Sequence, residues 1–395
     1  MRHFAKRRRG CATLAGIVSA TLAAQALAQP THTSLAPPSN RNALRRLAEG
    51  LEPDMRGQSD RLSQYVRAYR DALANDPRLF AFDVVASVVD GKPVLEGYVE
   101  FPETRRGLEG LLRELGFSEI DNHVETLPDP RLGERNVGLV VAPHAFCYDV
   151  PTGKRSVVTE CLVGEPVFLL RVQDGCYLVH SVEGYLGFIN VQDVRRVAVD
   201  EFRAYLDAPA IRLVADVPLG DKILPAGARL KCERRGDDSA TVELPNGEQG
   251  EVPLAATQPT AAPEETVEAA IASGKRLLGT PYQWGGRTKA GIDCSGLVQL
   301  SYATVGVNLA RDSNQQYLSG ALVATRWNRD GLRRGDTLYF LGEFGRIRHT
   351  AIYLGEGRFL QAEMPVVTIS SFNQGDPDYE ASRDKSFAFG KRLLQ

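Results

Sequence analysis

The feature that most limits the possible folds of this chain is a cysteine at the junction of a glycine-rich loop and a helical pattern. The loop contains Gly285, Gly286 and Gly291, and the helical pattern covers residues 297–305, just after Cys294. Free backbone N–H groups and the positive end of the helix dipole favour the thiolate at such a helix start, and the thiolate is the reactive form. The position makes Cys294 a candidate nucleophile, with an inert buried cysteine as the alternative.

A candidate base, His349, lies in an apolar run over residues 348–354 that predicts a buried strand. Turn residues 355–357 follow, and residues 358–362 predict the second strand of a hairpin. His349 and Gln361 would then share one face of the hairpin on opposite or diagonal rungs. We expect Cys294 to attack, His349 to take and return the proton, and the Gln361 amide oxygen to fix the imidazole tautomer without adding charge. The alternative is a chance cysteine, a core histidine and a surface glutamine.

Several segments in the right order resemble the NlpC/P60 family of cell-wall cysteine peptidases, from about residue 267 to the C-terminus. They are residues 278–286, 293–296, 311–316 and 332–340, followed by His349 and its hairpin. The resemblance implies a papain-like catalytic domain and an α+β fold. The family usually has His at the third catalytic position, where this sequence has Gln361. Because this member only orients the imidazole, an amide can replace it with a modest effect on the pH profile, as Asn does in papain-like enzymes.

A chain of 395 residues with 43% hydrophobic residues is too long for one ordinary domain and can build several cores. The predicted divisions are a signal peptide at 1–28, a linker at 29–57 with room for a short helix around residues 44–47, an N-terminal α+β module at 58–130, SH3-like domains at 137–200 and 205–257, and the catalytic domain at 266–395.

Residues 1–28 have a basic start, an apolar stretch over residues 11–26 and a small-residue end, which predicts a secretory signal. A membrane anchor is the alternative, although the stretch is short and rich in Ala and Thr. We expect export to the periplasm or cell envelope and no membrane anchor after cleavage. Cleavage removes five basic residues and no acidic ones, so the formal charge changes from −2 to −7 (−2 − 5).

A negative mature chain has no general attraction to nucleic acid or anionic lipid. Affinity for an anionic substrate would have to come from local cations, and we expect each basic residue near the site to be a solvated surface charge. These residues are Arg287, Lys289, Arg311, Arg346 and Arg348.

The N-terminal module has a strand, strand, helix, strand pattern that resembles the BON-type modules of cell-envelope proteins, with a generic α+β spacer as the alternative. Its expected elements are a helix over 58–76, strands over 82–89 and 94–101, a helix over 104–115 and a strand over 122–127. Short strands with frequent turns over 137–199 and 211–256 then suggest small barrels. Residues 184–189 and 247–252 resemble the closing strands of bacterial SH3-like modules, two of which commonly precede an NlpC/P60 domain. Residues 258–263 predict a linker.

Five cysteines follow residue 28, and an odd count in an exported chain leaves at least one free thiol, for which Cys294 is the natural candidate. Cys147 could pair with Cys161 or Cys176 in an oxidising compartment. No matching His cluster accompanies the cysteines, so we expect no zinc site, and no cofactor.

Two SH3-like modules before the catalytic domain resemble the family branch that cleaves γ-D-glutamyl–diamino acid bonds in muropeptides with a free N-terminal L-Ala. The resemblance implies that Asp312 receives the substrate ammonium, because a buried ammonium requires an opposed charge. Asp312 could instead cap a helix over residues 314–316. Ser313 is a further candidate for substrate binding.

The same resemblance implies that Tyr282 and Trp284 line the pocket, and that the Tyr282 hydroxyl helps the Cys294 N–H to stabilise the oxyanion. A packing role is the alternative for both aromatic residues. Ser295 would hold the α-carboxylate of D-Glu, and Asp293 would hold the loop.

Tyr148 and Asp149 are candidates for the pocket wall contributed by the first SH3-like domain. Related chains have an aromatic residue before Gly-Glu, where this one has Val163, Gly164 and Glu165. This departure argues against a strict requirement for a free amine.

The predicted reaction is acyl transfer from the γ-D-glutamyl carbonyl to Cys294, release of the diaminopimelate or lysine amine with a proton from His349, and hydrolysis. The expected partners are peptidoglycan stem peptides or muropeptides, and the oligomeric state is open. The alternatives are a cell-wall amidase or acyltransferase of the same fold, and a non-catalytic peptidoglycan-binding protein.

Overall fold

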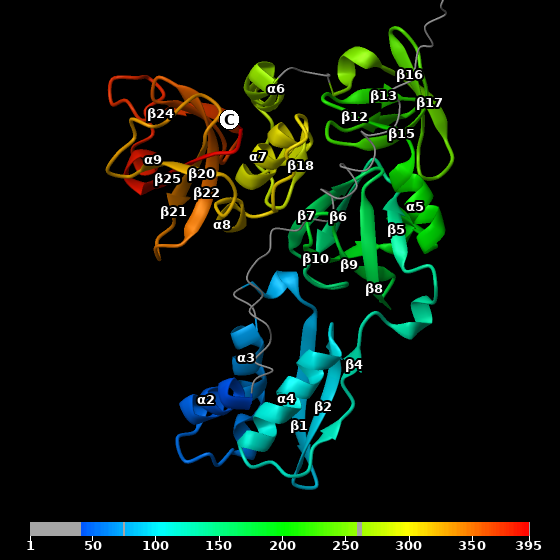
Figure 1. Ribbon diagram of the computed structural model, residues 1–395, viewed down its shortest axis with the longest axis vertical. Helices are drawn as coiled ribbons and strands as arrows, with labels where there is room; N and C mark the ends of the chain where they lie inside the picture. The colour runs from blue at the N-terminus through cyan, green and yellow to red at the C-terminus, as the bar shows by residue number, and fades with distance from the viewer. Residues whose placement is uncertain (1–40, 74–75, 259–262, 395) are drawn as a thin grey trace, which may run out of the picture.

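The computed structural model describes residues 41–73, 76–258 and 263–394. An N-terminal module (residues 41–127) lies at one end of the molecule, below two β units (residues 137–197 and 210–257), and the C-terminal domain (residues 263–394) lies beside the β units (Figure 1). The predicted signal peptide at 1–28 and the first part of the linker lie outside the described residues. So do residues 259–262 of the second predicted linker.

The N-terminal module packs three helices against a four-stranded sheet of order β1-β2-β3, in which β4 also pairs with β2. β1 and β2 are antiparallel, whereas β3 and β4 run parallel to β2. The predicted order of elements is confirmed. Its elements are α2 (Arg41–Leu51), η1 (Ser59–Arg61), α3 (Leu62–Leu73), η2 (Pro77–Leu79), β1 (Phe82–Val89), β2 (Lys92–Val99), α4 (Pro102–Glu114), β3 (Asp121–Asn122) and β4 (Glu125–Thr126).

The short helix expected around residues 44–47 is present as α2, but it extends over Arg41–Leu51 and belongs to the N-terminal module instead of a linker. Leu44 and Ala48 of α2 are buried in the core of the N-terminal module, where α2 packs against α4. Leu44, Leu47, Ala48 and Leu51 recur at helical spacing among charged residues, and this spacing gives the helix an apolar face.

The first β unit is a seven-stranded sheet of order β11-β5-β8-β9-β10-β6-β7. The second combines a four-stranded sheet of order β12-β15-β16-β17 with the β13–β14 hairpin. The expected short strands are present, and the likeness of the units to SH3-like domains stays a prediction. The elements are η3 (Pro130–Leu132), β5 (Val137–Val140), β6 (His144–Tyr148), β7 (Val157–Leu162), β8 (Pro166–Gln173), β9 (Cys176–His180), β10 (Leu186–Asn190), η4 (Val191–Asp193), β11 (Val194–Val197), α5 (Val199–Asp207), β12 (Ala210–Arg212), β13 (Val217–Leu219), β14 (Lys222–Leu224), β15 (Arg229–Arg235), β16 (Ser239–Glu243), β17 (Gln249–Pro253) and η5 (Leu254–Ala256).

The C-terminal domain packs α6 and α7 against a six-stranded sheet of order β20-β25-β21-β22-β23-β24. The predicted hairpin is confirmed: β22 pairs with β23 in a register that places Ile352 opposite Leu360. The elements are α6 (Pro263–Lys275), β18 (Arg287–Thr288), β19 (Gly291–Ile292), α7 (Cys294–Ala303), α8 (Ser313–Gln316), β20 (Ala321–Thr325), β21 (Thr337–Leu341), β22 (Ile347–Gly355), β23 (Arg358–Ala362), β24 (Val367–Ser371), α9 (Ala381–Ser386) and β25 (Phe387–Arg392).

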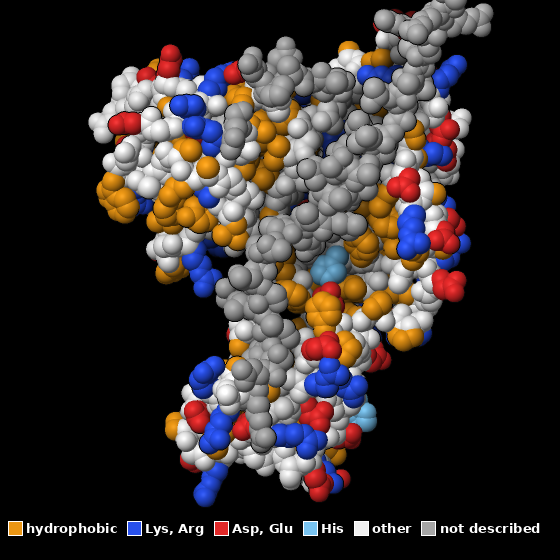
Figure 2. All heavy atoms as spheres, in the orientation of Figure 1, with side chains coloured by type: hydrophobic (Ala, Val, Ile, Leu, Met, Phe, Trp, Pro, Cys, Tyr) orange, Lys and Arg blue, Asp and Glu red, His pale blue; other side chains and the backbone are white. Residues whose placement is uncertain are grey.

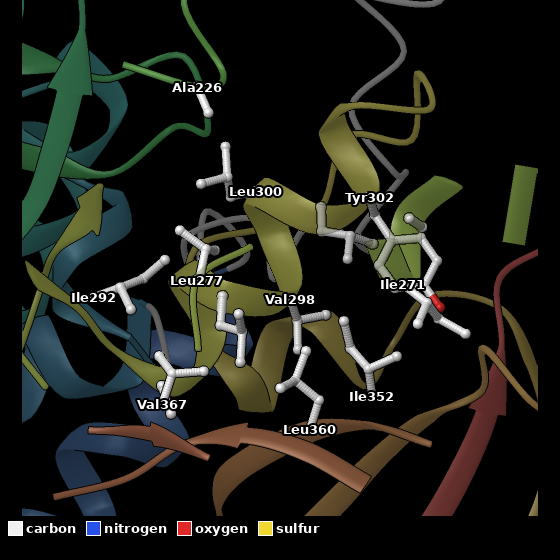
Figure 3. Packing of buried hydrophobic residues seen from close by; sticks show 14 residues of the cluster. Ala226, Ile271, Leu277, Ile292, Val298, Leu300, Tyr302, Ile352, Leu360 and Val367 are labelled. Atoms are coloured by element: carbon white, nitrogen blue, oxygen red, sulfur yellow. The ribbon is translucent and has the colours of Figure 1, made fainter. Parts of the chain in front are cut away.

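The core of the C-terminal domain surrounds α7, whose ten residues are all buried. Val298 of α7 lies between Ile271 of α6 and Leu360 of the sheet, while Leu300 points toward Ala226 of the second β unit (Figure 3). The helix is buried on all sides, and its polar side chains Gln299 and Ser301 donate to backbone carbonyl groups, so its surroundings fix the start of α7 in the interior.

Acidic and basic side chains are interspersed on the face of the N-terminal module seen in Figure 2. In the described part of the chain, no helix is both long enough and apolar enough to span a membrane.

Candidate active site

Cys294 is the first residue of α7, and Asp293 precedes it as the N-cap. The Asp293 carboxylate accepts hydrogen bonds from the N–H of Gly296 (2.7 Å) and, across the loop, from the N–H of Gly285 (2.8 Å). Helix α7 packs against β22, the strand that carries His349. The N–H of Thr350, the residue after His349, lowers the pKa of the Cys294 thiol. The packing thus brings the helix start that carries the predicted nucleophile to the strand that carries the predicted base.

His349 and Gln361 meet diagonally across the β22–β23 hairpin, as their spacing predicts. Nε2 of His349 lies 2.7 Å from Oε1 of Gln361, and the Gln361 amide nitrogen donates to Oγ of Ser370 (2.9 Å). In this orientation the amide nitrogen of Gln361 donates to Ser370 and its oxygen faces the ring. Nε2 must then carry the proton, which leaves Nδ1 free to accept one. The sequence analysis did not identify Ser370 as a residue of the site.

Burial holds both members of the pair in their neutral forms. It raises the pKa of the Cys294 thiol to about 12, with a contribution from the negative charge of Asp293, while the N–H of Thr350 and the charge of Arg311 act in the opposite direction. Burial, assisted by Arg383, lowers the pKa of His349 to about 3. The helix start acts in the expected direction, since the N–H of Ser295 lowers the pKa of the thiol, but desolvation outweighs it and keeps the thiol protonated in this enclosed state.

Arg311 is a fully buried cation at the base of the site, and the expectation of a solvated surface charge is wrong for it. Its guanidinium pairs with Asp293 (2.7 Å) and donates to Oγ of Ser295 (2.9 Å) and Oγ1 of Thr159 (3.1 Å). Two segments adjoining the nucleophile are thus tied to one cation that reaches the first β unit. The burial of Arg311 depends on contacts between segments that lie far apart in the sequence, so the local hydrophobic pattern could not predict it.

Arg287 is also buried, against the first β unit, so the expectation of a solvated surface charge is wrong for it as well. Lys289, Arg346 and Arg348 are exposed, as expected. Arg287 forms a two-pronged ion pair with Glu165 at 3.0 and 3.1 Å, and its backbone N–H donates to Glu160.

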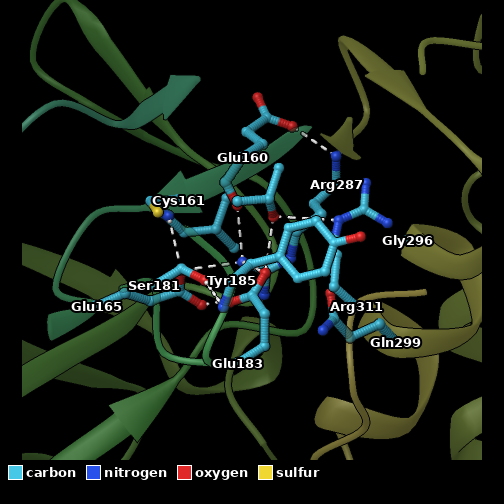
Figure 4. A network of polar contacts seen from close by, with 12 residues as sticks. Glu160, Cys161, Glu165, Ser181, Glu183, Tyr185, Arg287, Gly296, Gln299 and Arg311 are labelled. Carbon is cyan, nitrogen blue, oxygen red and sulfur yellow. Dashed lines mark hydrogen bonds and ion pairs between the residues drawn. The ribbon is translucent and has the colours of Figure 1, made fainter. Parts of the chain in front are cut away.

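Acidic side chains of the first β unit meet these arginines in a buried network (Figure 4). Glu183 lies 3.7 Å from Arg287 and accepts from Thr159, which in turn accepts from Arg311. Buried charges are tolerated when they are paired and hydrogen-bonded, so this network couples the first β unit to the N-cap of α7. The sequence analysis did not predict this network, because its members lie far apart in the sequence.

Asp312 lies at the N-cap position of α8, but its side chain makes no capping hydrogen bond. Its Oδ2 lies 2.7 Å from Nη2 of Arg78, in the N-terminal module. Tyr185 of the first β unit adjoins this pair, and burial together with Asp312 raises the pKa of its phenol. Arg78 and Tyr185 were not among the predicted residues.

The predicted aromatic residues differ in exposure. Tyr282 is partly buried against the core around α7, and burial and the charge of a Cys294 thiolate both raise the pKa of its phenol. Trp284 is 53% exposed. Ser313 is buried at the first turn of α8, and the Ser295 hydroxyl is engaged by Asp293 and Arg311.

The described contacts of Tyr148 and Asp149 lie within the first β unit. Arg155 stacks over the Tyr148 ring at 3.9 Å, and Asp149 accepts from the N–H of Ser156 (2.8 Å). The polar side chains of this unit that approach the C-terminal domain include Thr159, Glu160, Glu165, Glu183 and Tyr185.

The sulfur atoms of Cys147 and Cys161 are buried 3.6 Å apart as free thiols, whereas Cys176 lies beside Pro151 and Asn190. Within the described ranges, no cluster of three His, Cys, Asp or Glu side chains is placed to hold a metal ion.

A buried thiol at a helix start, beside an imidazole whose far nitrogen is held by an amide oxygen, defines a hydrolase with a cysteine nucleophile. Residues 279–382 match the NlpC/P60 family, so the C-terminal domain is an NlpC/P60 cysteine peptidase domain.

Curated relatives and solved structures extend the comparison. The chain is 29% identical over 119 residues to a gamma-D-glutamyl-L-lysine dipeptidyl-peptidase of Bacillus cereus, a match over 30% of this chain and 34% of the relative. It is 26% identical over 267 residues to dipeptidyl-peptidase 6 of Lysinibacillus sphaericus, a match over 61% of this chain and 93% of the relative. The structure of an NlpC/P60 family protein from Bacillus cereus aligns with 66% of this chain and 100% of its own, with a TM-score of 0.56 at 21% identity. Because residues 263–394 are a minority of the chain, the shared fold extends beyond the C-terminal domain.

Proposed function

We propose that the protein is an exported peptidoglycan hydrolase that cleaves the γ-D-glutamyl–diamino acid bond of stem peptides. The observation that carries this proposal is the arrangement of Cys294, His349 and Gln361 at the start of α7. Relatives named for γ-D-glutamyl dipeptidyl-peptidase activity support the choice of bond. Residues 1–28 predict secretion, and we propose that the enzyme acts in the periplasm or cell envelope.

The reaction follows from the tautomer of His349. Nδ1 accepts the thiol proton while the Cys294 sulfur attacks the γ-carbonyl carbon of D-Glu, and the carbonyl oxygen becomes an oxyanion near the Cys294 N–H and the Tyr282 hydroxyl. The C–N bond breaks as His349 returns the proton to the leaving amine of diaminopimelate or lysine. Water, deprotonated by His349, then hydrolyses the thioester. The neutral starting pair means that proton transfer accompanies attack.

Asp312 would select the substrate by pairing with the free ammonium of an N-terminal L-Ala. It is a partly buried carboxylate, and its side chain is not used to cap α8. Tyr185 and Glu183 of the first β unit would line the same end of the pocket, and Ser295 would face the α-carboxylate of D-Glu. Tyr148 and Asp149 would line the pocket further away from Asp312, on the side formed by the first β unit.

The test compares the purified mature protein with Cys294→Ala on L-Ala-γ-D-Glu-diaminopimelate, on the lysine peptide and on the matching tetrapeptides, with products identified by mass spectrometry. We expect L-Ala-γ-D-Glu as a product of the wild type and none from the variant. Unchanged hydrolysis by Cys294→Ala would reject the mechanism. Cleavage of a different bond would favour an amidase of the same fold.

A further inference from the structure

The tetrapeptide Asp-Pro-Arg-Leu occurs twice in this chain, at residues 76–79 and 129–132. Each copy forms a 3-10 turn in which the Asp accepts from the N–H of the Arg, at 3.1 Å for Asp76 and 2.9 Å for Asp129. In each copy the guanidinium also folds back onto its own Asp. The two copies therefore share the 3-10 turn and the Asp–Arg contacts, although the backbone at their caps differs, and only the first copy meets the C-terminal domain through its Arg and Asp.

The first copy is docked on the C-terminal domain. Nη2 of Arg78 lies 2.7 Å from Oδ2 of Asp312, and its guanidinium stacks over the Tyr185 ring at 4.9 Å. Gln315 of α8 donates to Asp76 at 2.9 Å. The Arg78 side chain is 36% exposed, whereas that of Arg131 in the second copy is 74% exposed.

The N-terminal module is itself fastened to the first β unit, so Arg78 is presented by a docked body. Glu100 lies 2.9 Å from Nε2 of His180, and a buried apolar cluster spans the boundary. The cluster consists of Ala81, Tyr98, Leu127, Leu170, Cys176, Leu178, Leu186 and Phe188.

We propose that Arg78 occupies the subsite for the substrate's N-terminal ammonium, so that the N-terminal module restrains the entry of free-amine muropeptides. This inference rests on the proposed role of Asp312 as the ammonium anchor. Two cations on one carboxylate repel each other, and the tethered guanidinium is already paired with Asp312. A free-amine substrate must displace Arg78, whereas an N-acylated substrate brings no competing charge.

The first experiment measures kcat/KM for L-Ala-γ-D-Glu-diaminopimelate and for its N-acetylated form. In Arg78→Ala we expect the ratio of free to acetylated substrate to rise about tenfold or more, mainly through a lower KM for the free amine. Arg78→Gln, which keeps the side-chain length, should behave in the same way. Arg131→Ala, the matched change in the second copy, should keep the wild-type ratio.

A further control separates loss of the cation from undocking of the module. Glu100→Ala removes a contact between the module and the first β unit without touching Asp312. If undocking acts by releasing Arg78 from Asp312, adding Glu100→Ala to Arg78→Ala should not raise the ratio further. A further rise of similar size in the double variant would show that undocking acts independently of Arg78, and it would reject the proposal.

The second experiment does not depend on turnover. Calorimetry measures the binding of the dipeptide L-Ala-γ-D-Glu, free and N-acetylated, to Cys294→Ala with and without Arg78→Ala. When Arg78 is absent, we expect the free dipeptide to bind about tenfold more tightly and the N-acetylated dipeptide to bind with unchanged affinity. If binding changes in this way but no variant hydrolyses the peptide, the proposed reaction fails and the occluded subsite stands. Hydrolysis that depends on Cys294, with an unchanged ratio and unchanged binding, rejects the role of Arg78 only. No binding by either protein rejects the subsite and its occlusion together.

Discussion

The opposite pKa shifts of Cys294 and His349 determine how the reactivity of the thiol should depend on pH. Because the thiolate is the nucleophile and burial raises the thiol pKa to about 12, alkylation should accelerate about tenfold per pH unit from pH 7 to 10 without a plateau. The measurement is the rate of iodoacetamide labelling at the peptide that contains Cys294, followed by mass spectrometry. A plateau near pH 7 would instead indicate a stable thiolate–imidazolium pair.

Gln361 orients His349 through its oxygen because Ser370 holds its amide nitrogen. Gln361→Ala should lower kcat by up to about 100-fold, since a misplaced base loses its alignment with the thiol. Gln361→Glu should keep more activity and shift the acid limb of the pH profile upward, because a carboxylate raises the pKa of an adjacent imidazole.

Full activity of Gln361→Ala would show that the amide is not needed. Ser370→Ala is the intermediate case: the amide stays but is free to turn, so kcat should fall less than in Gln361→Ala.

At the scale of elements, the start of α7 depends on Asp293, which caps the helix, holds the glycine loop and pairs with buried Arg311. Asp293→Ala should lower the free energy of unfolding by about 3–5 kcal/mol, because it leaves a buried cation without its partner. Arg311→Met in the same chain should restore part of the loss. Urea denaturation measures both.

A matched control for this change is Glu380→Ala. Glu380 caps surface helix α9 through the N–H of Ser382 and adjoins no buried cation, so its removal should cost about 1 kcal/mol. Equal losses for Asp293→Ala and Glu380→Ala would mean that the buried ion pair contributes nothing.

The local hydrophobic pattern of the sequence predicted the elements that carry the catalytic residues. It did not predict contacts between segments that lie far apart in the sequence. The hairpin of His349 and Gln361 and the start of α7 follow from strand and helix periods within one short segment. Helix α2 was expected only as a short helix within a linker, and its packing in the N-terminal module was not predicted, because its charged residues obscure a narrow apolar face. The burial of Arg311 depends on the first β unit, far away in sequence, and no local period contains that information.

At the scale of the whole molecule, the first β unit and the C-terminal domain are joined closely enough to complete one site. Gly285 has a φ of 78°, and a Cβ there would lie 2.4 Å from Val157 of the first β unit, so the loop before Cys294 requires glycine for both reasons. Leu300 of α7 likewise contacts the second β unit beside Ala226. A comparison restricted to residues 279–382 therefore omits the residues of the two β units that contact the glycine loop and α7.

The interface between the first β unit and the C-terminal domain should be destabilised when Arg287 is replaced. Arg287→Met would leave the buried carboxylates of Glu165 and Glu183 without their cation, at a cost of about 3–5 kcal/mol. We expect scanning calorimetry to show an earlier transition for the first β unit, separated from that of the C-terminal domain, together with a loss of peptidase activity. Lys289→Met, an exposed change two positions away, should leave both unchanged. Glu165→Gln added to Arg287→Met should recover part of the stability, because it removes one of the stranded charges. A single transition at the wild-type temperature in Arg287→Met would show that the two bodies are held together by their apolar contacts alone.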